Sequence, residues 1–226
     1  MTPLQNVMAD EQSRKRRAHG YETPRPEVQA LVPTTAQRIL ELGCSTGALG
    51  AGIKVRNKGF VFGVEIDPEY ARQAEQRLDR VVVADAEVFL HESKPDEAPF
   101  DCLIGADVFE HLLDPWGALE RAADWLGPGA TVVISLPNVL YWPGLLRVVR
   151  EGRWPRDDEG IFDRTHIRWF SPRDAVELLE GAGLRVRTAS PVYRTGGLRL
   201  MLTKAWGRTP LRRFLARQWM FVAVKP

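Results

Sequence analysis

The chain has 226 residues, of which 44% are hydrophobic and 27% are charged, and its net charge is +2. This length and composition suit one globular domain with a full-sized core, and the small net charge excludes a global field that would attract nucleic acid or anionic membranes. Two cysteines make no disulfide framework, so we expect a reducing compartment and a cytoplasmic protein. We find no apolar run of the ~20 residues that a membrane span needs, and the first residues lack the apolar centre of a signal peptide.

The first 35 residues differ in character from the rest. Residues 1–20 are polar and end in a basic run, which predicts a solvated arm rather than a nucleic-acid contact. Residues 21–33 contain three prolines, which predict an extended or turned entry segment. We therefore expect residues 1–35 to form an arm and cap, and residues 36–226 to form one domain.

From Arg38 onward, strand-like and helix-like runs alternate. The strand-like runs are Arg38–Leu42, Phe60–Glu65, Arg80–Ala84, Asp101–Ala106 and Thr131–Leu136. The helix-like runs are Gly47–Arg56, Pro68–Leu78, Ala86–His91 and Pro115–Leu126. This alternation predicts parallel strands in a doubly wound α/β sheet. Runs such as Val81–Val83 and Val132–Ile134 are apolar throughout, as strands covered by helices on both faces require.

After Leu136 the regular alternation stops. Residues 137–170 are aromatic and irregular in pattern. The sequence SPRD then predicts a helix start, with Ser171 as N-cap, Pro172 in the first turn and Asp174 completing a capping box. Residues 184–193 and 219–224 predict two last strands. The basic amphipathic residues 196–217 between them predict one or two helices packed on the sheet edge, and the alternative is contact with a partner subunit or a membrane surface.

A glycine-rich turn follows the first strand-like run and contains Gly43, Ser45, Gly47 and Gly50. Ligands of open parallel sheets bind at the carboxyl ends of the strands, where such a turn lies. The pattern departs from the dinucleotide fingerprint G-x-G-x-x-G, because Ser45 occupies the place of the second glycine. The alternative interpretation is a tight strand-to-helix turn that binds no ligand.

Acidic residues lie at or next to the ends of three of the strand-like runs. Glu41 would repel a pyrophosphate, and it suits a ligand that has a positive charge and an amino group. Glu65 ends the second run, where an acid accepts hydrogen bonds from ribose hydroxyls. Asp85 is placed either to meet an adenine amino group or to cap the next helix, whereas Asp67-Pro68 predicts a helix cap. An adenosine with a cationic, amino-acid tail is S-adenosylmethionine.

Four motifs in order resemble those of class I S-adenosylmethionine-dependent methyltransferases. They are ELGCSTG (Glu41–Gly47), GVEIDP (Gly63–Pro68), ADAE (Ala84–Glu87) and DCLIGADVFEHLLDP (Asp101–Pro115). The resemblance extends from about Tyr21 to the C-terminus. It implies a Rossmann-like, doubly wound, seven-stranded sheet whose last strand is antiparallel, with a lid insertion at residues 137–170 after the fifth strand.

The same resemblance implies S-adenosyl-L-methionine as the methyl donor and S-adenosyl-L-homocysteine as the product. The residues expected to bind the cofactor are Tyr21, Glu41, Gly43, Cys44, Ser45, Gly47, Glu65, Ile66, Asp85, Ala86 and Ala106.

Candidate catalytic groups lie after the fourth strand-like run and in the expected lid at residues 137–170. A protonated hydroxyl is a poor nucleophile, so methyl transfer to oxygen needs a base or a metal. Asp107, Glu110 and His111 are spaced to share one face of a helical turn. His166 lies in the sequence FDRTHIRWF. The alternatives are that His111 only packs in its turn and that His166 belongs to a salt-bridged lid.

The stretch from Leu136 to Ser171 resembles a subgroup of these enzymes, many of them O-methyltransferases, associated with glycan and secondary-metabolite pathways. This implies a hydroxyl of a sugar, glycan or other small natural product as the acceptor. The D-x-x-E-H set with a later histidine also resembles the E-x-x-E-H…H arrangement of metal-dependent 2′-O-methyltransferases of small RNAs, although the first acid here is Asp107. A divalent metal is left open.

Other functions are kept as alternatives. A nicotinamide-dependent oxidoreductase is disfavoured by Ser45 and Glu41 in the glycine-rich turn. It is also disfavoured because the sequence lacks a residue pair such as Tyr-x-x-x-Lys that would assist hydride transfer. A non-catalytic, methyltransferase-like scaffold is the alternative from another class. A nucleic-acid methyltransferase is permitted by the basic runs but not favoured by the net charge. We expect a small-molecule or glycan acceptor as the partner, expect no nucleic acid, and leave a homodimer open.

Overall fold

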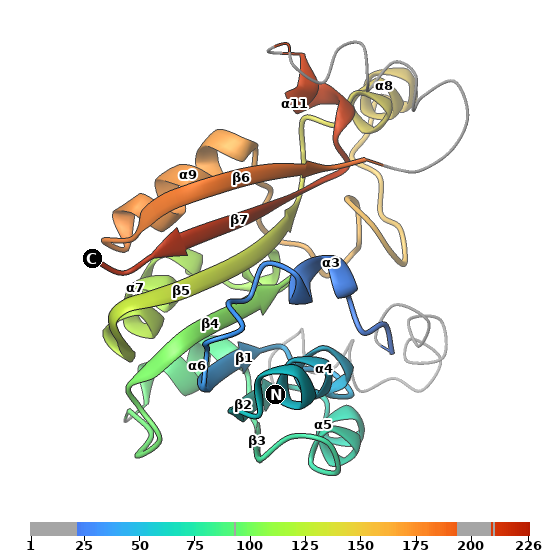
Figure 1. The fold of residues 1–226 in the computed structure, drawn as a ribbon. Helices are drawn as coiled ribbons and strands as arrows, with labels where there is room; N and C mark the ends of the chain where they lie inside the picture. Colours follow the sequence, from blue (N-terminus) through green and yellow to red (C-terminus); the bar gives the residue numbers. More distant parts are fainter. Residues whose placement is uncertain (1–21, 93, 194–208, 210) are drawn as a thin grey trace.

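The computed structural model describes residues 22–92, 94–193, 209 and 211–226. Its centre is a seven-stranded sheet in the order β3-β2-β1-β4-β5-β7-β6 (Figure 1). The strands are β1 (Arg38–Leu42), β2 (Phe60–Glu65), β3 (Arg80–Val83), β4 (Phe100–Ala106), β5 (Leu126–Pro137), β6 (Arg185–Val192) and β7 (Gln218–Val224). Strand β7 runs antiparallel to its neighbours β5 and β6, and the other pairs are parallel. The predicted Rossmann-like α/β sheet with an antiparallel last strand is confirmed.

Helices cover the sheet on both faces. One face packs against α3 (Pro26–Gln29), α4 (Ala48–Asn57) and α5 (Pro68–Ala74), and the other against α6 (Ala86–His91), α7 (Pro115–Asp124) and α9 (Pro172–Gly181). Within the described ranges, no helix is long and apolar enough to cross a membrane. The two helical layers bury the strands between them, so the ligand-accessible edge of the sheet is where the strands end.

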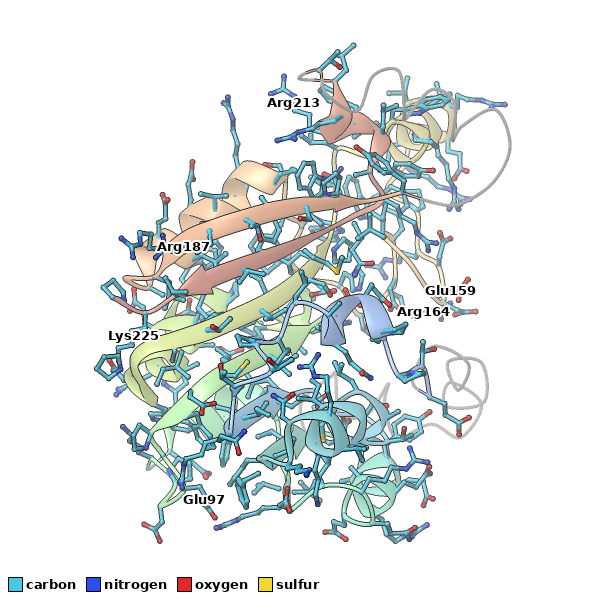
Figure 2. All side chains as sticks on the ribbon, viewed as in Figure 1. Glu97, Glu159, Arg164, Arg187, Arg213 and Lys225 are labelled. Carbon is cyan, nitrogen blue, oxygen red and sulfur yellow. The ribbon has the colours of Figure 1, made fainter. Side chains whose placement is uncertain are left out.

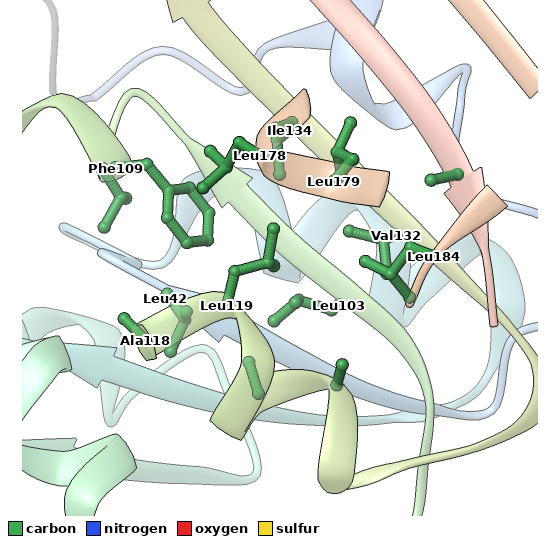
Figure 3. Close-up of a cluster of buried hydrophobic side chains, with 14 of the residues drawn as sticks. Leu42, Leu103, Phe109, Ala118, Leu119, Val132, Ile134, Leu178, Leu179 and Leu184 are labelled. Carbon is green, nitrogen blue, oxygen red and sulfur yellow. The ribbon is translucent and has the colours of Figure 1, made fainter. Parts of the chain in front are cut away.

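Alternation along the strands divides the apolar side chains between two cores. In β5, Val132 and Ile134 belong to the larger core and Val133 to the smaller one. Figure 3 shows Ile134 beside Leu178 of α9 in the larger core. The expectation that strands are covered on both faces is wrong for β3, because this strand lies at the sheet edge and Val83 is 50% exposed.

The helix starts follow the predicted capping residues. Asp67 accepts a hydrogen bond from the Glu69 N–H at 2.8 Å, so the predicted cap of α5 is confirmed. Ser171 accepts from the N–H groups of the first turn of α9, and Asp174 accepts from the Ser171 N–H, which confirms the capping box. These caps satisfy N–H groups that a helix leaves without partners, and they fix where each strand-to-helix turn lies.

The segment from residue 137 to 170 is more regular than the sequence pattern suggests. It contains helix α8 (Trp142–Glu151), which follows Pro137 after a short turn. Trp154 then packs edge-on against both Phe162 and Trp169, with ring centroids 5.1 and 5.0 Å apart. None of the residues of α8 is buried, although its sequence contains leucines and valines as well as arginines. Its function as a lid stays a prediction.

The basic amphipathic stretch at 196–217 falls largely outside the described residues. Its last part forms the short helix α11 (Arg212–Leu215) before β7. Asn138 joins this part to the end of β5, since its side-chain amide donates to the carbonyls of Arg213 and Ala216 at 2.6 and 2.7 Å. The contact places the chain that enters β7 beside the end of β5.

Candidate active site

A cavity of about 590 Å³ lies at the carboxyl ends of the parallel strands. Its wall is formed by the turns after β1, β2, β3 and β4, by the start of β7 and by residues 158–166. Figure 2 shows Glu159, which contributes to this wall, at the opposite end of the sheet from Lys225. The volume lies in the range of about 300–1,000 Å³ that is usual for small-molecule sites.

The turn after β1 lies at the cavity, and its backbone adopts positive φ values that residues other than glycine disfavour. Gly43, Ser45 and Gly47 have φ values of 64°, 50° and 78°. A Cβ on Gly43 would lie 2.6 Å from Cγ2 of Val108, so only glycine fits between β1 and the turn after β4. Gly43, Cys44 and Ser45 line the cavity. Gly47 instead faces α5, since its Cβ would lie 3.1 Å from Cα of Ala74.

Two buried carboxylates stand on either side of this turn. Glu41 and Glu65 are 2% and 4% exposed, and both line the cavity. Burial, with the nearby Glu65 charge, raises the pKa of Glu41 to about 8, and burial raises the pKa of Glu65 to about 7. Glu65 accepts from the N–H groups of Ser45 and Asp67 at 2.7 and 2.9 Å, whereas Oε2 of Glu41 has no hydrogen-bond partner among the described residues. A cation bound here would stabilise the ionised form of Glu41.

The turns after β2 and β3 supply the next part of the wall. Ile66, Asp85 and Ala86 line the cavity, as does Ala106 at the end of β4. Asp85 is the N-cap of α6, and its Oδ1 accepts from the N–H of Glu87 at 2.9 Å. The predicted cap is therefore confirmed, and the contact of Asp85 with an adenine amino group stays a prediction. Tyr21, the remaining predicted cofactor residue, lies outside the described residues.

Asp107 lines the cavity together with Glu110 and His111. The helical turn that would place all three on one face does not form, because Asp107 has a φ of 60° and only η1 (Phe109–His111) follows. Oδ2 of Asp107 pairs with Nη1 of Arg25 at 2.7 Å. Oδ1 accepts from the Ser135 hydroxyl at 3.1 Å and from the Gln218 amide. Three elements thus converge on one carboxylate, which fixes α3 and the start of β7 to the cavity wall.

Arg25 and Gln218 are cavity residues that sequence reasoning missed. Arg25 stands between two prolines before α3, and Gln218 is the first residue of an ordinary-looking strand. Neither position matches a motif, and each meets Asp107 across more than 80 residues of sequence. No local signal could have found them.

Glu110, His111 and His166 form a compact group, named here the Glu-His-His cluster. One side-chain ligand atom from each of the three residues lies within 4.8 Å of the other two. Glu110 is 1% exposed, and its Oε1 is 3.8 Å from Nε2 of His166, too far for a hydrogen bond. The imidazole rings of His111 and His166 meet edge to face with centroids 4.7 Å apart. All three residues line the cavity.

The electrostatics of this cluster follow from burial. Burial, followed by the Asp107 charge, raises the pKa of Glu110 well above its ordinary value. Burial, followed by the neighbouring His166, lowers the pKa of His111 to about 4. His111 is therefore uncharged at neutral pH.

Backbone carbonyls fix the orientation of both imidazoles. Nδ1 of His111 lies 3.2 Å from the Thr165 carbonyl oxygen, and Nδ1 of His166 lies 3.0 Å from that of Ile161. A carbonyl can only accept, so each Nδ1 is the donor, and the uncharged ring of His111 presents the lone pair of its Nε2. The N–H groups of Ile167 and Arg168 both donate to the Glu110 carbonyl at 3.0 Å, which joins η1 to the segment that contains His166.

Comparison with known proteins identifies the family. A family model described as a methyltransferase domain matches residues 14–189, so the chain belongs to this methyltransferase family. An uncharacterised methyltransferase of Mycobacterium bovis is 27% identical over 163 residues, which cover 67% of this chain and 78% of that protein. A ubiquinone biosynthesis O-methyltransferase of Aeromonas salmonicida is 27% identical over 161 residues, which cover 70% of this chain and 66% of that protein.

A solved structure shares the fold at low sequence identity. The N-methyltransferase NodS from Bradyrhizobium japonicum, in complex with S-adenosyl-L-homocysteine, has a TM-score of 0.61 and 15% identity, and the match covers 99% of this chain and 96% of that one. This chain is a class I methyltransferase, and its cofactor is S-adenosyl-L-methionine. The residues of the cavity fit this cofactor. Glu41 has a carboxylate oxygen without a partner among the described residues, which suits a cationic ligand. Gly43 occupies a position that only glycine fits, which lets a ligand lie close to the backbone.

Proposed function

We propose that this methyltransferase acts on a hydroxyl oxygen of a small acceptor, either a sugar or glycan or another small natural product. The observation that supports it most directly is the Glu-His-His cluster in the wall of the cofactor cavity. An alcohol oxygen needs help to become a nucleophile, and this cluster is the group of side chains suited to give it. One relative, from Aeromonas salmonicida, is named an O-methyltransferase.

The cofactor would be held by the strand-end turns. S-adenosyl-L-methionine supplies a methyl group that its sulfonium sulfur activates. Glu41 would pair with the positive charge of the amino-acid tail, and Glu65 would accept hydrogen bonds from ribose hydroxyls. Gly43 would allow the backbone to lie close to the ligand. Asp85 has one carboxylate oxygen committed to its helix cap, which leaves the other for a donor on the base.

The acceptor would lie between these turns and the Glu-His-His cluster. Methylation forms an oxygen–carbon bond as the carbon–sulfur bond of the donor breaks, and the acceptor loses one proton to solvent or to a basic group. The acceptor oxygen has to be held about 3–3.5 Å from the methyl carbon and in line with the departing sulfur. Leu112 and Ile161 contribute apolar surface to the same cavity, and Gln218 adds an amide. This mixture suits a small molecule with a ring and hydroxyl groups.

An acceptor screen with an isotopically labelled methyl group would test this function. The purified chain would be incubated with the labelled cofactor and matched panels of phenols, quinols, sugars and amines, and products would be identified by mass spectrometry and NMR. We expect a methyl ether whose formation disappears in Glu65→Ala and persists in His91→Ala, a change at an exposed histidine. Labelled amines or carbon-linked products, with no ether, would contradict the proposal.

A further inference from the structure

We propose that Arg217 determines the specificity for the acceptor, because its guanidinium binds a carboxylate that the acceptor carries in addition to its reacting hydroxyl. Arg217 directly precedes β7 and lines the cavity. This inference rests on the proposed function in one respect, namely that the molecule with the carboxylate is the methyl acceptor. The anion site itself stands on the position and the partners of this arginine.

The first argument is the charge of Arg217, which no neighbour neutralises. Arg25 and Arg217 are the two arginines that the described part of the cavity wall contains. Arg25 pairs with Glu27 and Asp107 at 2.6 and 2.7 Å. The guanidinium of Arg217 has no ion pair or hydrogen bond with any described residue. A guanidinium stays charged and offers five N–H donors, so this one lacks an anionic partner.

The second argument is how the fold holds this side chain at the wall. The N–H of Arg217 donates to the Val192 carbonyl at 3.1 Å, and its carbonyl accepts from the Asn138 N–H at 2.9 Å. Nη2 lies against Gly160, where an added Cβ would be 2.7 Å from it. Gly160 has a φ of 85°, and a side chain at that position would displace the guanidinium. Backbone hydrogen bonds and this glycine therefore keep the half-buried Arg217 at the cavity.

The place of Arg217 in the sheet separates it from the cofactor turns. The strand order in this part is β1-β4-β5-β7. Because neighbouring strands lie about 4.8 Å apart, the start of β7 is about 14 Å from the end of β1. Pro137 of β5 and Tyr193 after β6 line the cavity at this end. We therefore expect Arg217 to meet the acceptor rather than the carboxylate of the cofactor.

The acids of the wall leave little negative charge that would repel an anion at this end. Asp158 pairs with Arg164 at 2.5 Å, and Asp107 pairs with Arg25. Burial, followed by the Asp107 charge, raises the pKa of Glu110 well above its ordinary value, which favours its uncharged form. An acceptor carboxylate would therefore meet a net positive group at Arg217.

The single unpaired guanidinium fits a carboxylate better than a phosphate. A planar guanidinium makes two parallel hydrogen bonds with a carboxylate, and one positive charge balances one negative charge. A phosphate monoester carries about −1.5 to −2 charges at neutral pH, which Arg217 alone would not balance. Glu159 lines the same wall and would repel the second charge. Tyr193 also lines the cavity, and its hydroxyl can donate a further hydrogen bond.

The test compares carboxylates with their uncharged and phosphorylated counterparts. The full-length chain, saturated with S-adenosyl-L-homocysteine, would be titrated with glucuronate, glucose and glucose 6-phosphate. A second panel would be 4-hydroxybenzoate, 4-hydroxybenzamide and 4-hydroxyphenyl phosphate, and ligand-observed NMR would measure binding in both. We expect a carboxylate to bind about 10- to 100-fold more tightly than its two counterparts, as hydrogen bonds to charged groups permit.

Three variants assign this preference to the arginine. Arg217→Met keeps the length of the side chain and removes its charge, so the preference should be lost. Arg217→Lys keeps the charge but not the paired hydrogen bonds, so it should retain part of the preference. Arg187→Met is the control, because Arg187 is exposed in β6 and Figure 2 shows it toward the opposite end of the sheet from Glu159. It should bind all six compounds as the wild type does.

Three results would overturn the inference. The first is a wild type that binds no carboxylate more tightly than its counterparts, and the second is a preference that persists in Arg217→Met. The third is loss of S-adenosyl-L-homocysteine binding in an Arg217→Met chain with the circular dichroism of the wild type, which would assign the arginine to the cofactor.

The acceptor screen separates this inference from the proposed function. A methyl ether that forms equally well in wild type and Arg217→Met retains the proposed function and overturns the anion site. Carboxylate binding that Arg217→Met abolishes, in a chain that forms no ether, retains the anion site and contradicts the proposed function.

Discussion

The two halves of the cavity treat their buried carboxylates differently. In the cofactor half, formed by Glu41 and the turns after β1, β2 and β3, Glu65 receives two backbone N–H groups, and Oε2 of Glu41 has no partner among the described residues. In the acceptor half, formed by the Glu-His-His cluster, neither carboxylate oxygen of Glu110 has a hydrogen-bond partner within the described part of the chain. The chain therefore satisfies part of the cofactor half by itself, whereas it leaves the carboxylate of the acceptor half for a group that binds there.

The largest expected effect breaks the acceptor half alone. With a hydroxyl acceptor at saturating concentration, His166→Ala and Glu110→Gln should lower kcat by on the order of 10²–10⁴-fold, the usual contribution of a group that activates a nucleophile. His91→Ala is the matched control and should retain the wild-type rate. A kcat within threefold of wild type in both cluster variants would show that the cluster is not part of the chemistry.

A second prediction tests the cofactor half through its backbone. Gly43→Ala should lower the free energy of unfolding more than Gly129→Ala, because both residues have positive φ but only Gly43 would bring its Cβ against Val108. Left-handed backbone costs about 1–2 kcal/mol in either variant, and overpacking adds about 1–3 kcal/mol at Gly43 alone. Urea denaturation of the two variants measures the difference. Equal losses would mean that the turn after β1 moves to accept a methyl group.

A third prediction concerns proton binding by Glu41. Its pKa is about 8 in the folded chain and 4.5 ordinarily, so between these pH values the folded state binds more protons than the unfolded state. The stabilising effect of the protonated form is complete below pH 4.5 and is lost as pH rises through 8, with a slope of at most about 1.4 kcal/mol per pH unit. Unfolding measured from pH 6 to pH 9 should show a shallower decline in Glu41→Gln than in wild type.

Glu65 remains ionisable in both chains of that comparison, so the difference between the two slopes reports on Glu41. Parallel pH profiles for wild type and Glu41→Gln would show that Glu41 is ionised throughout, and that the cofactor half provides it with a charge partner before any ligand binds.

The smallest expected effect concerns the contact that joins the two halves. Arg25→Ala removes the ion pair with Asp107, in which the two side chains are 21% and 32% exposed. Pairs with this exposure contribute less than about 1 kcal/mol, so the free energy of unfolding should fall by no more than that. Arg72→Ala, which removes a more exposed pair with Glu69, is the control and should have no larger effect. A loss well above 1 kcal/mol would show that this ion pair contributes more to stability than its exposure predicts.

The same division separates what the sequence could predict from what it could not. The cofactor half is made of consecutive strand-to-helix turns, so short motifs such as Glu41–Gly47 predicted its strands and most of the residues that line it, and β1 and β2 have the predicted bounds. Gly47 is the exception, because it faces α5. The acceptor half joins residues more than 50 positions apart, as in the contact between His111 and the Thr165 carbonyl. Sequence could name these histidines, but neither their tautomers nor the diversion of Asp107 to Arg25 follows from local pattern.

Calorimetric titration of S-adenosyl-L-homocysteine into wild type, Glu65→Ala and His166→Ala tests the division between the two halves most directly. We expect micromolar binding to wild type and to His166→Ala, and its loss in Glu65→Ala. Absence of binding to wild type would contradict this expectation, as would equal losses in the two variants, because the cofactor half would then not bind its ligand independently of the Glu-His-His cluster.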